Sequence, residues 1–296
     1  MTVSLKIFCG DGEVVRSLRI GSRLDKYRLI KKLGYGGFAT VYAALDQIEN
    51  RQVAIKVPEE KYVADAASLE DLQREVRIMA KLEHQHIVQL KDARFIDGRF
   101  VMVFPLGVES LDSRLQRRMG RQTAVDFARQ MVTAVAFAHG NKILHRDIKP
   151  DNFILFANNH LRLTDFGLAR VQRGRFDRSA SGTLGYMAPE QAMGRPTFRS
   201  DVFSLGLVMY RMFAGALPTY PFEAPLPGAA RAKRILSPEY LALIRKAIEP
   251  SPTKRFRDAV AMLNAISQIR QPLKETTRAK ASATASKRSS RRRSAA

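Results

Sequence analysis

The spacing of apolar residues changes near Leu106, and this change limits the possible folds more than any other feature of the chain. Before it, short strand-like runs such as 27–33, 40–45 and 51–57 are separated by Gly, Asp and Asn, as turns require. After it, apolar residues recur mostly at helical spacing. The pattern predicts an α+β fold with a small β-rich front lobe, a larger helical back lobe and a cleft between them.

Several element boundaries can be predicted within this outline. Residues 87–90 and 99–106 have the apolar character of two further strands. We expect the main helix of the front lobe over 68–82, where Ser68 and Asp71 would form a capping box. Its inward face is predicted from four apolar residues at helical spacing: Leu69, Leu72, Val76 and Met79.

Two helix starts are predicted in the back lobe. Thr123 and Asp126 have the spacing of a second capping box, which would open a helix that runs to about His139. Ser237 followed by Pro238 is typical of an N-cap with proline at the first helical position.

Composition excludes several classes of protein. The chain has 296 residues, of which 45% are hydrophobic, so a wholly disordered chain is excluded and a sizeable core is expected. Its one cysteine excludes a disulfide framework and favours a reducing compartment. No apolar stretch is long enough for a membrane helix and the start does not resemble a secretory signal, so we expect a cytoplasmic protein with no transmembrane segment.

The net charge of +22 is unevenly distributed along the chain. Residues 271–296 carry eight Lys or Arg and one Glu, with almost no large apolar residue, which predicts a disordered basic tail. The tail could be an inert extension, bind an anionic polymer or lipid, or be phosphorylated at its serines. The remaining +15 lies in the body. Residues 1–24 form an N-terminal extension whose alternating apolar positions are compatible with a hairpin.

Two short segments of the front lobe suggest phosphate binding, but each is weak alone. Glycines in the segment 34–41 would let the backbone approach phosphate oxygens, although a tight hairpin would use the same residues. Lys56 ends the strand segment Val-Ala-Ile-Lys, where a lysine usually points to solvent. Glu75 shares the predicted buried face of the helix 68–82 and needs a cationic partner there, unless it lies at a solvated rim. Lys56 is the natural candidate.

The segment His-Arg-Asp-Ile-Lys-Pro-Asp-Asn at 145–152 resembles the catalytic loop of protein kinases. Asp-Phe-Gly follows at 165–167 and Ala-Pro-Glu at 188–190, which is the order of the kinase signature set. The chain is similar to eukaryotic-type (Hanks-type) serine/threonine protein kinases over about residues 25–268, most of all to bacterial members. The resemblance implies a bilobal protein-kinase fold and an ATP-dependent phosphotransferase.

The resemblance also implies the roles of individual residues. Asp147 would take the proton of the acceptor hydroxyl, Lys149 would neutralise the transferred γ-phosphate, and Asn152 and Asp165 would hold Mg²⁺, or Mn²⁺ as an alternative. Thr183 would tie the substrate-docking segment to the catalytic residues. The residues implied in ATP binding are Leu33, Gly34, Tyr35, Gly36, Gly37, Phe38, Ala39, Val41, Ala54, Lys56, Glu75, Phe104 and Asp165.

Acceptor type and regulation follow from the same resemblance. Lys149 and Thr183 are typical of the serine/threonine branch rather than of tyrosine kinases. Arg146 before the catalytic Asp often accompanies activation by a phosphorylated loop in the family, so autophosphorylation at Ser179 or Ser181 is a hypothesis. The alternative is that these serines only fill a loop.

Other residues are expected to be architectural. Glu190 and Arg255 match a structural ion pair of the family, and Asp201 should brace the backbone of the catalytic loop. His84 and His86 resemble the family's turn between helix and strand, and we favour this over a metal site because no cysteine lies nearby.

The chain departs from the family pattern at several positions. Ala39 replaces the third glycine, and Phe203 stands where Trp or Tyr is common, which are both small changes. The gatekeeper beside the adenine could be Val103 or Phe104. Residues 216–236 are short and rich in proline where the family has a clearer helix that helps to dock substrates.

Our leading hypothesis is a serine/threonine protein kinase that acts on proteins and binds ATP. A pseudokinase scaffold, a nucleic-acid-associated regulatory protein that uses the basic tail, and a small-molecule kinase are alternatives. The sequence predicts no oligomeric state. The expected domains are the extension 1–24, the kinase domain 25–270 with lobes of about 25–104 and 108–270, and the tail 271–296.

Overall fold

The computed structural model divides into two compact units, and each is described by itself. It describes residues 18–36, 38–166, 185–270 and 273. The first, sheet unit comprises the chain up to Glu70 together with Leu90–Leu106, and the second, helical unit comprises Asp71–Gln89 and the chain from Gly107 on. Residues 71–89, expected in the front lobe, therefore group with the helical unit.

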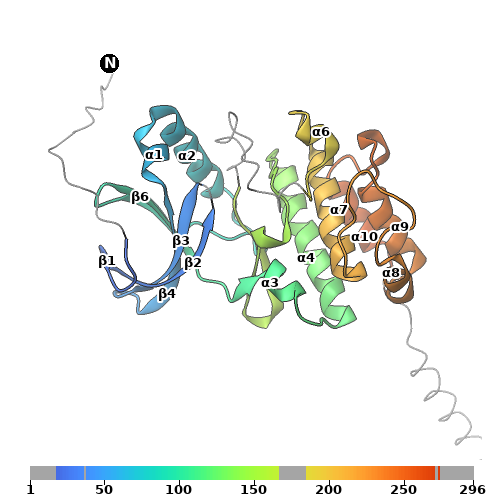
Figure 1. Ribbon diagram of the computed structural model, residues 1–296, viewed down its shortest axis with the longest axis horizontal. Helices are drawn as coiled ribbons and strands as arrows, with labels where there is room; N and C mark the ends of the chain where they lie inside the picture. Colours follow the sequence, from blue (N-terminus) through green and yellow to red (C-terminus); the bar gives the residue numbers. More distant parts are fainter. Residues whose placement is uncertain (1–17, 37, 167–184, 271–272, 274–296) are drawn as a thin grey trace, which may run out of the picture. The chain divides into compact units, whose positions relative to one another are not determined.

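The sheet unit is built on one six-stranded antiparallel sheet with the strand order β1-β2-β3-β4-β6-β5 (Figure 1). Its elements are β1 Arg23–Leu24, β2 Tyr27–Gly36, β3 Ala39–Asp46, β4 Arg51–Pro58, α1 Glu60–Ala64, β5 Asp92–Ile96 and β6 Arg99–Pro105. The first three predicted strands are confirmed. β2 extends further than expected, because the glycine-rich segment pairs with β3 as far as Gly36 opposite Ala39.

The strand predicted at 87–90 is wrong. Ile87 makes only an isolated bridge to Leu163, and the strand forms at Asp92–Ile96 instead. A two-residue Asp97–Gly98 turn connects it to β6, and both turn residues have positive φ, 48° and 73°. Such a turn matches the twist of paired strands and fixes their register, which the mixed polar sequence of β5 does not reveal.

Strand alternation separates the core of the sheet unit from its other face. Val53, Ile55 and Val57 of β4 lie in the buried apolar cluster of this unit. Ala54 and Lys56 alternate with them and therefore point to the opposite face. This alternation places the lysine of Val-Ala-Ile-Lys away from the apolar core.

The main helix, α2, runs over Ala66–Met79 and thus begins and ends earlier than predicted. The capping box of Ser68 and Asp71 is wrong, because Ser68 is already helical and its N–H donates to Asp65 Oδ2 at 2.8 Å. Asp65 lies three residues before Ser68, and its short side chain supplies the N-terminal acceptor that was expected from Ser68. Leu72 and Met79 are buried as expected, and Glu75 shares their face with only 3% exposure.

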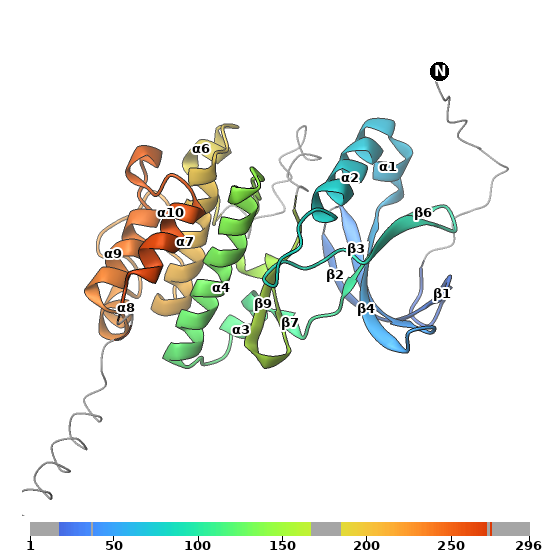
Figure 2. The same cartoon turned by 180° about the vertical axis from the view of Figure 1, so that it is seen from behind.

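The helical unit surrounds one deeply buried helix, α7 Phe198–Ala214 (Figures 1 and 2). Nearly all its residues are buried, and it packs against α4, α8, α9 and α10. A helix that is apolar on all sides is stable only inside such a bundle. The other elements are β7 Glu109–Ser110, α3 Leu111–Leu115, α4 Arg121–Gly140, η1 Pro150–Asn152, β8 Phe153–Phe156, η2 Ala157–Asn159, β9 His160–Leu163, α6 Pro189–Ala192, α8 Ala229–Ile235, α9 Pro238–Ala247, η4 Pro252–Lys254 and α10 Ala259–Ser267.

The two predicted helix starts of this unit have different outcomes. At α9 the prediction is confirmed, because Ser237 Oγ accepts the Tyr240 N–H at 3.3 Å and Pro238 is the first helical residue. At α4 the helix is confirmed but the capping box is wrong. The N-cap of α4 is Gly120, which has no side chain to offer, and Asp126 accepts from the Gln122 amide instead.

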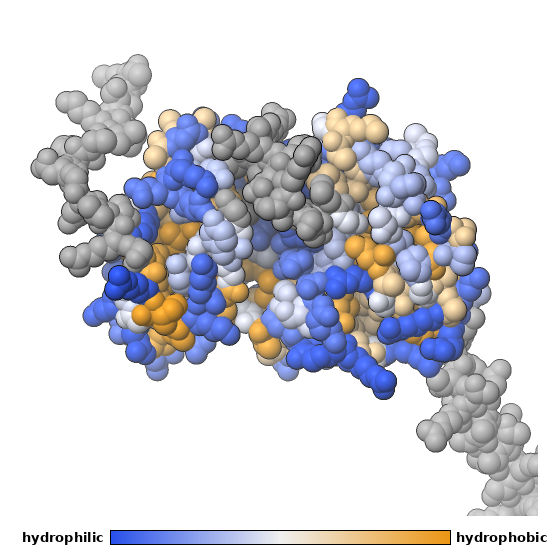
Figure 3. Space-filling model, viewed as in Figure 1, coloured by the Kyte–Doolittle hydropathy of each residue, from blue (hydrophilic) through white to orange (hydrophobic). Residues whose placement is uncertain are grey.

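The face shown in Figure 3 is largely hydrophilic, and its apolar side chains form scattered patches rather than a continuous belt. Among the described residues, no helix combines the length and the apolar character that a membrane crossing requires.

Candidate active site

The predicted catalytic loop brings three of its polar side chains together in the helical unit. Lys149 Nζ lies 2.9 Å from Asp147 Oδ2. The Asn152 amide donates to the same oxygen at 2.9 Å and to the Asp147 carbonyl at 2.7 Å. The Asp147 carboxylate remains 24% exposed. It is therefore oriented by two donors while it stays accessible to another molecule.

The amide orientation of Asn152 fits a cation ligand. Its nitrogen is committed to two oxygens of Asp147, so its amide oxygen is directed elsewhere and can act as a hard ligand. Asp165 lies in the left-handed backbone region with φ of 63°, as does Arg146 with φ of 68°. Such backbone strain in non-glycine residues is concentrated at functional sites.

The Asp201 side chain of α7 binds the backbone of the predicted catalytic loop, as predicted. Its carboxylate accepts the backbone N–H groups of His145 and Arg146, each at 2.8 Å. The His139 imidazole of α4 lies 3.1 Å from the same carboxylate, and the Asp201 side chain is 1% exposed. Burial by itself raises the pKa of Asp201, but the hydrogen bonds from His139 and the loop backbone hold this pKa below its ordinary value.

His145 connects the catalytic loop to the start of the Asp-Phe-Gly segment. Its Nδ1 accepts the Asp147 N–H at 3.3 Å, and its Nε2 lies 2.8 Å from the Thr164 carbonyl. These bonds require a neutral imidazole that carries its proton on Nε2 and donates it to Thr164. The ring also packs edge-on against Phe166, with centroids 4.8 Å apart.

The predicted ion pair of Glu190 and Arg255 is present, with Nη1 2.7 Å from Oε1 and Nη2 3.2 Å from Oε2. Ser200 Oγ also donates to Glu190 at 2.7 Å, and the Arg255 guanidinium lies 4.4 Å over the Phe203 ring. Partial burial raises the pKa of Glu190, but its bonds from Arg255 and Ser200 outweigh this and lower the pKa. The pair fixes the segment that begins with Pro189.

Several residues of this region were missed by sequence reasoning. Gln191 donates to the Arg146 carbonyl at 2.5 Å, which links α6 to the catalytic loop. Arg211 of α7 donates to Asp112 at 2.6 Å and to the Tyr186 hydroxyl at 2.7 Å. Nothing in the spacing of these residues along the chain connects them, so no local pattern could have indicated the contacts.

The glycine-rich segment of the sheet unit has a defined tip. The Phe38 ring packs on Tyr62 of α1 at 4.7 Å, and the Phe38 carbonyl accepts the Glu59 N–H at 2.9 Å. The Tyr35 hydroxyl donates to Glu59. A Cβ added at Gly34 or Gly36 would contact no atom, and neither glycine has a positive φ. The fold itself does not require glycine at these two positions, which fits a segment that phosphate oxygens approach closely.

Strand register identifies the residues that share a face with Lys56. Val41 and Met102 lie directly opposite Lys56 in the neighbouring strands, and Phe104 lies opposite Ala54. Val103 pairs with Ile55 and belongs to the apolar core, so it lies on the opposite face of the sheet from Lys56. Phe104 remains a candidate for the gatekeeper. Met102 lies in register with Lys56, but the sequence did not indicate this position. A shift of the strand pairing by one residue moves each side chain to the other face, and the register cannot be determined from one strand alone.

The remaining predicted residues have mixed outcomes. Leu33 lies at a bulge of β2 and is 46% exposed. Lys56 and Glu75 are both buried but belong to different units, so their pairing stays a prediction. Thr183 lies outside the described residues. The same holds for Gly37 and for the phosphosite candidates Ser179 and Ser181.

The two histidines of the predicted turn have architectural contacts. The His84 ring stacks on Phe137 of α4 with centroids 4.6 Å apart. His86 Nδ1 lies 3.0 Å from the Leu161 carbonyl oxygen, which is a hydrogen-bond distance. Burial lowers the pKa of both histidines, which favours the neutral imidazole.

Comparison with known proteins extends this picture. Residues 27–265 match the protein kinase domain family. The CBL-interacting serine/threonine-protein kinase 12 of Arabidopsis thaliana is 33% identical over 248 residues, which cover 79% of this chain and 50% of that protein. A probable serine/threonine-protein kinase of Clostridium acetobutylicum is 30% identical over 269 residues, or 83% of this chain and 40% of that one. The chain thus spans half or less of the length of these relatives.

Among solved structures, the kinase domain of Mycobacterium tuberculosis PknI is similar, with a TM-score of 0.64 and 23% sequence identity. The match covers 85% of this chain and 99% of the PknI chain. It confirms the predicted bilobal α+β protein-kinase fold. With the family match over 27–265, it leads to one conclusion: the chain belongs to the protein kinase domain family.

Proposed function

We propose that the protein is a serine/threonine protein kinase that transfers the γ-phosphate of ATP to hydroxyl groups of protein substrates. The observation that carries the proposal is the arrangement of Asp147, oriented by Lys149 and Asn152 in a loop that Asp201 holds by its backbone. Phosphoryl transfer needs positioned groups more than covalent chemistry, and this loop supplies them.

Asp147 acts as the acceptor of the substrate proton. Its carboxylate is partly accessible, and a hydroxyl that donates to it would be held ready for attack on phosphorus. Lys149 is within ion-pair distance of Asp147, so its ammonium group is already positioned to neutralise the charge that develops on the transferred phosphoryl group. The rigid anchor at Asp201 keeps the loop from rearranging as this charge develops.

The nucleotide and metal roles are assigned to two separate sets of residues. Lys56 and the backbone of 34–41 bind the ATP phosphates, and the face shared by Ala54, Met102 and Phe104 accommodates the adenine side. Asn152 and Asp165 supply oxygen ligands for Mg²⁺, with Mn²⁺ as an alternative. Among the described residues, no three His, Cys, Asp or Glu side chains form a metal site by themselves. A magnesium ion usually takes its other ligands from phosphate and water.

The serine/threonine assignment rests on Lys149 and Thr183 and on the names of the similar proteins. The Arabidopsis thaliana and Clostridium acetobutylicum proteins are both described as serine/threonine-protein kinases. Autophosphorylation at Ser179 or Ser181 is part of this proposal.

The test is transfer of labelled phosphate from ATP with magnesium to a generic protein acceptor. Asp147→Asn should lower kcat by about 10³-fold or more, since a positioned base contributes 10²–10⁴-fold and the loop contacts also change. Asp126→Asn makes the same chemical change on the exposed side of α4 and serves as the control. Equal and measurable rates for wild type and Asp147→Asn would refute the proposed role of Asp147, whereas no transfer by either protein would favour a pseudokinase scaffold.

Phosphoamino-acid analysis of the same reaction tests the acceptor type. We expect phosphoserine and phosphothreonine, and phosphotyrosine alone would contradict the assignment. Peptide mapping of the active protein tests Ser179 and Ser181 directly.

The binding of an anionic polymer or lipid by residues 271–296 is a separate proposal that rests on the charge of this segment. Deletion of these residues should abolish salt-sensitive binding to DNA or to anionic vesicles. Unchanged binding after the deletion would exclude this role for the tail.

A further inference from the structure

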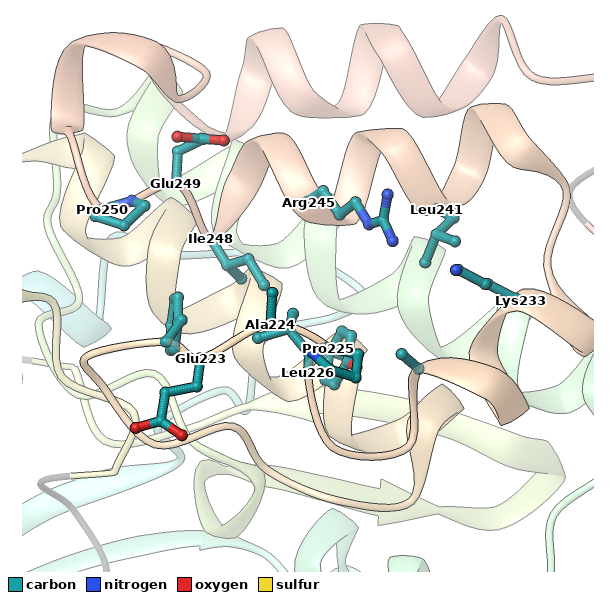
Figure 4. Close-up of a pocket in the computed structure, with 13 residues that line it drawn as sticks. Glu223, Ala224, Pro225, Leu226, Lys233, Leu241, Arg245, Ile248, Glu249 and Pro250 are labelled. Atoms are coloured by element: carbon teal, nitrogen blue, oxygen red, sulfur yellow. The ribbon is translucent and has the colours of Figure 1, made fainter.

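The helical unit contains a cavity of about 410 Å³ in which no catalytic-loop residue takes part (Figure 4). Its walls come from α7, α8, α9 and the loop that precedes α8. The volume falls in the range of about 300–1,000 Å³ that is typical of ligand pockets. Residues 216–236 stand where the family has a helix that helps to dock substrates, but this expectation does not name a ligand for the cavity.

The floor of the cavity is apolar. Tyr210 of α7, Leu241 and Ile248 are each at least nine-tenths buried and line it together with Pro225 and Leu226 of the loop. An apolar floor that is open on one side favours a bulky aliphatic or aromatic group of a ligand.

The loop wall is held in place by contacts with α7. The Tyr210 hydroxyl donates to the Pro227 carbonyl at 2.9 Å, and the Phe222 ring stacks on Phe203 at 5.9 Å. Gly228 has φ of 72°, and a Cβ there would lie 2.4 Å from the Ala214 carbonyl oxygen, so the loop backbone sits directly on the end of α7. A preformed wall reduces the entropy that a ligand must lose on binding.

The opposite wall is fixed by the buried arginine of the ion pair. Arg255 Nε donates to the Glu249 carbonyl at 2.6 Å, and its Nη2 donates to the Pro250 carbonyl at 2.9 Å. The same guanidinium binds Glu190, so this end of the cavity is joined to α6.

The charges around the cavity are separated into two ends. Figure 4 shows Lys233 and Arg245 beside Leu241 at one end, whereas Glu223 and Glu249 lie at the other. Lys233 and Arg245 are exposed, and within the described residues neither makes an ion pair. α8 strengthens the positive end because it carries three basic residues and no acidic one.

We infer that this cavity binds an acidic segment of another protein, in which a bulky apolar side chain is followed by carboxylates. The apolar side chain enters the floor formed by Tyr210, Leu241 and Ile248. The carboxylates then meet Lys233 and Arg245, while Glu223 and Glu249 disfavour the reverse orientation. This binding requires no phosphoryl transfer and stands apart from the proposed kinase activity.

The charge pattern disfavours other occupants. The chain's own segment 274–296 is strongly basic and would bring like charges to Lys233 and Arg245. An anionic membrane would meet Glu223 and Glu249 together with the two cations, because all four side chains surround one small opening. An acidic peptide can contact one end only.

The experiment measures fluorescence anisotropy of a labelled nine-residue peptide that has two leucines followed by three glutamates, with the full chain. Lys233→Glu and Arg245→Glu should each weaken binding by about tenfold or more, and the effect should diminish at high salt. Replacing the leucines of the peptide with serines should abolish binding. A companion peptide with lysines in place of glutamates should bind the double variant Lys233→Glu/Arg245→Glu better than it binds the wild type.

Arg234→Glu is the matched control, because it neighbours Lys233 on α8, makes the same charge change and does not line the cavity. It should weaken binding by about threefold or less. All these side chains are exposed, so folding is checked by the thermal midpoint of each variant. Equal losses for Lys233→Glu and Arg234→Glu, no binding of the acidic peptide, or preferential binding of a 274–296 peptide or of anionic vesicles at this cavity would overturn the inference.

Discussion

The two units of the molecule hold a buried carboxylate in different ways. In the sheet unit, Asp46 accepts the N–H groups of Ile48 and Glu49 at 3.0 and 3.1 Å and pairs with Lys26 at 2.8 Å. Apart from Lys26, these partners lie within three residues of Asp46. In the helical unit, Asp201 binds three groups that lie 55 to 62 residues away in the sequence.

The difference shows how each unit positions its functional residues. The sheet unit relies on local turns and on strand register, which place Lys56 on its face through main-chain pairing. The predicted catalytic loop has little regular structure of its own, so it depends on side chains supplied by α6 and α7. A loop that is held by distant partners should therefore be far more sensitive to one substitution than a strand is.

The largest expected effect is at Asp201. Asp201→Ala leaves the His145 and Arg146 N–H groups and the buried His139 without their acceptor, so we expect a loss of about 3–5 kcal/mol in the free energy of unfolding. Urea denaturation measures it. Asp201→Asn keeps one acceptor oxygen, so its loss in the free energy of unfolding should be smaller. An effect of Asp201→Ala no larger than that of a surface substitution would show that the loop does not depend on this anchor.

The next effect is the response to acid of two carboxylates of the helical unit, Glu190 and Asp201. The pKa values of Glu190 and Asp201 are held below their ordinary values of 4.5 and 3.8. A carboxylate with a lowered folded pKa stabilises the fold above its unfolded pKa, and this stabilisation is lost as the pH falls through the folded pKa. The contribution of these two carboxylates to the free energy of unfolding should therefore be complete above about pH 5 and decrease below about pH 4.5.

Glu190→Gln tests the acid response, since it removes one titrating group and keeps the shape of the side chain. Its unfolding free energy should fall less steeply between pH 5 and pH 3 than that of the wild type. An identical slope would mean that the ion pair with Arg255 contributes nothing to acid sensitivity.

Asp46 should give a smaller loss than Asp201. In Asp46→Ala the N–H groups of the turn can bond to water instead, and Lys26 is already partly solvated. We therefore expect a loss of about 1–2 kcal/mol in the free energy of unfolding. Chemical denaturation of both alanine variants under one set of conditions makes the comparison direct. Equal losses for Asp46→Ala and Asp201→Ala would break the distinction between local and distant anchoring.

The smallest expected effect on stability is at Gly36. A Cβ at this position contacts nothing and φ is not positive, so Gly36→Ala should change the unfolding free energy by less than about 0.5 kcal/mol. If the proposed nucleotide role is correct, KM for ATP should rise in this variant. Gly98→Ala is the contrast, because its φ of +73° predicts a loss of about 1 kcal/mol without a change in KM.

Sequence reasoning was most successful where the determining interactions are local or carried by a motif. The strands of 27–57 and the cap at Ser237 follow from alternation and from a side chain that reaches its own helix. The capping boxes at Ser68 and Thr123 failed because a neighbouring residue, Asp65 or Gly120, begins the helix instead. Helix ends are decided by small differences between adjacent candidates.

By itself the sequence determined the fold class and the order of the two units, because apolar periodicity encodes them directly, and the resemblance of residues 145–152 to a kinase motif predicted the catalytic loop. Only the tertiary structure decided that Met102 rather than Val103 shares the face of Lys56, since register depends on the partner strand. It also decided that Arg211 reaches Tyr186 and that Lys233 and Arg245 meet at one end of a cavity. These pairs are made by packing of distant segments, which no local pattern in the chain records.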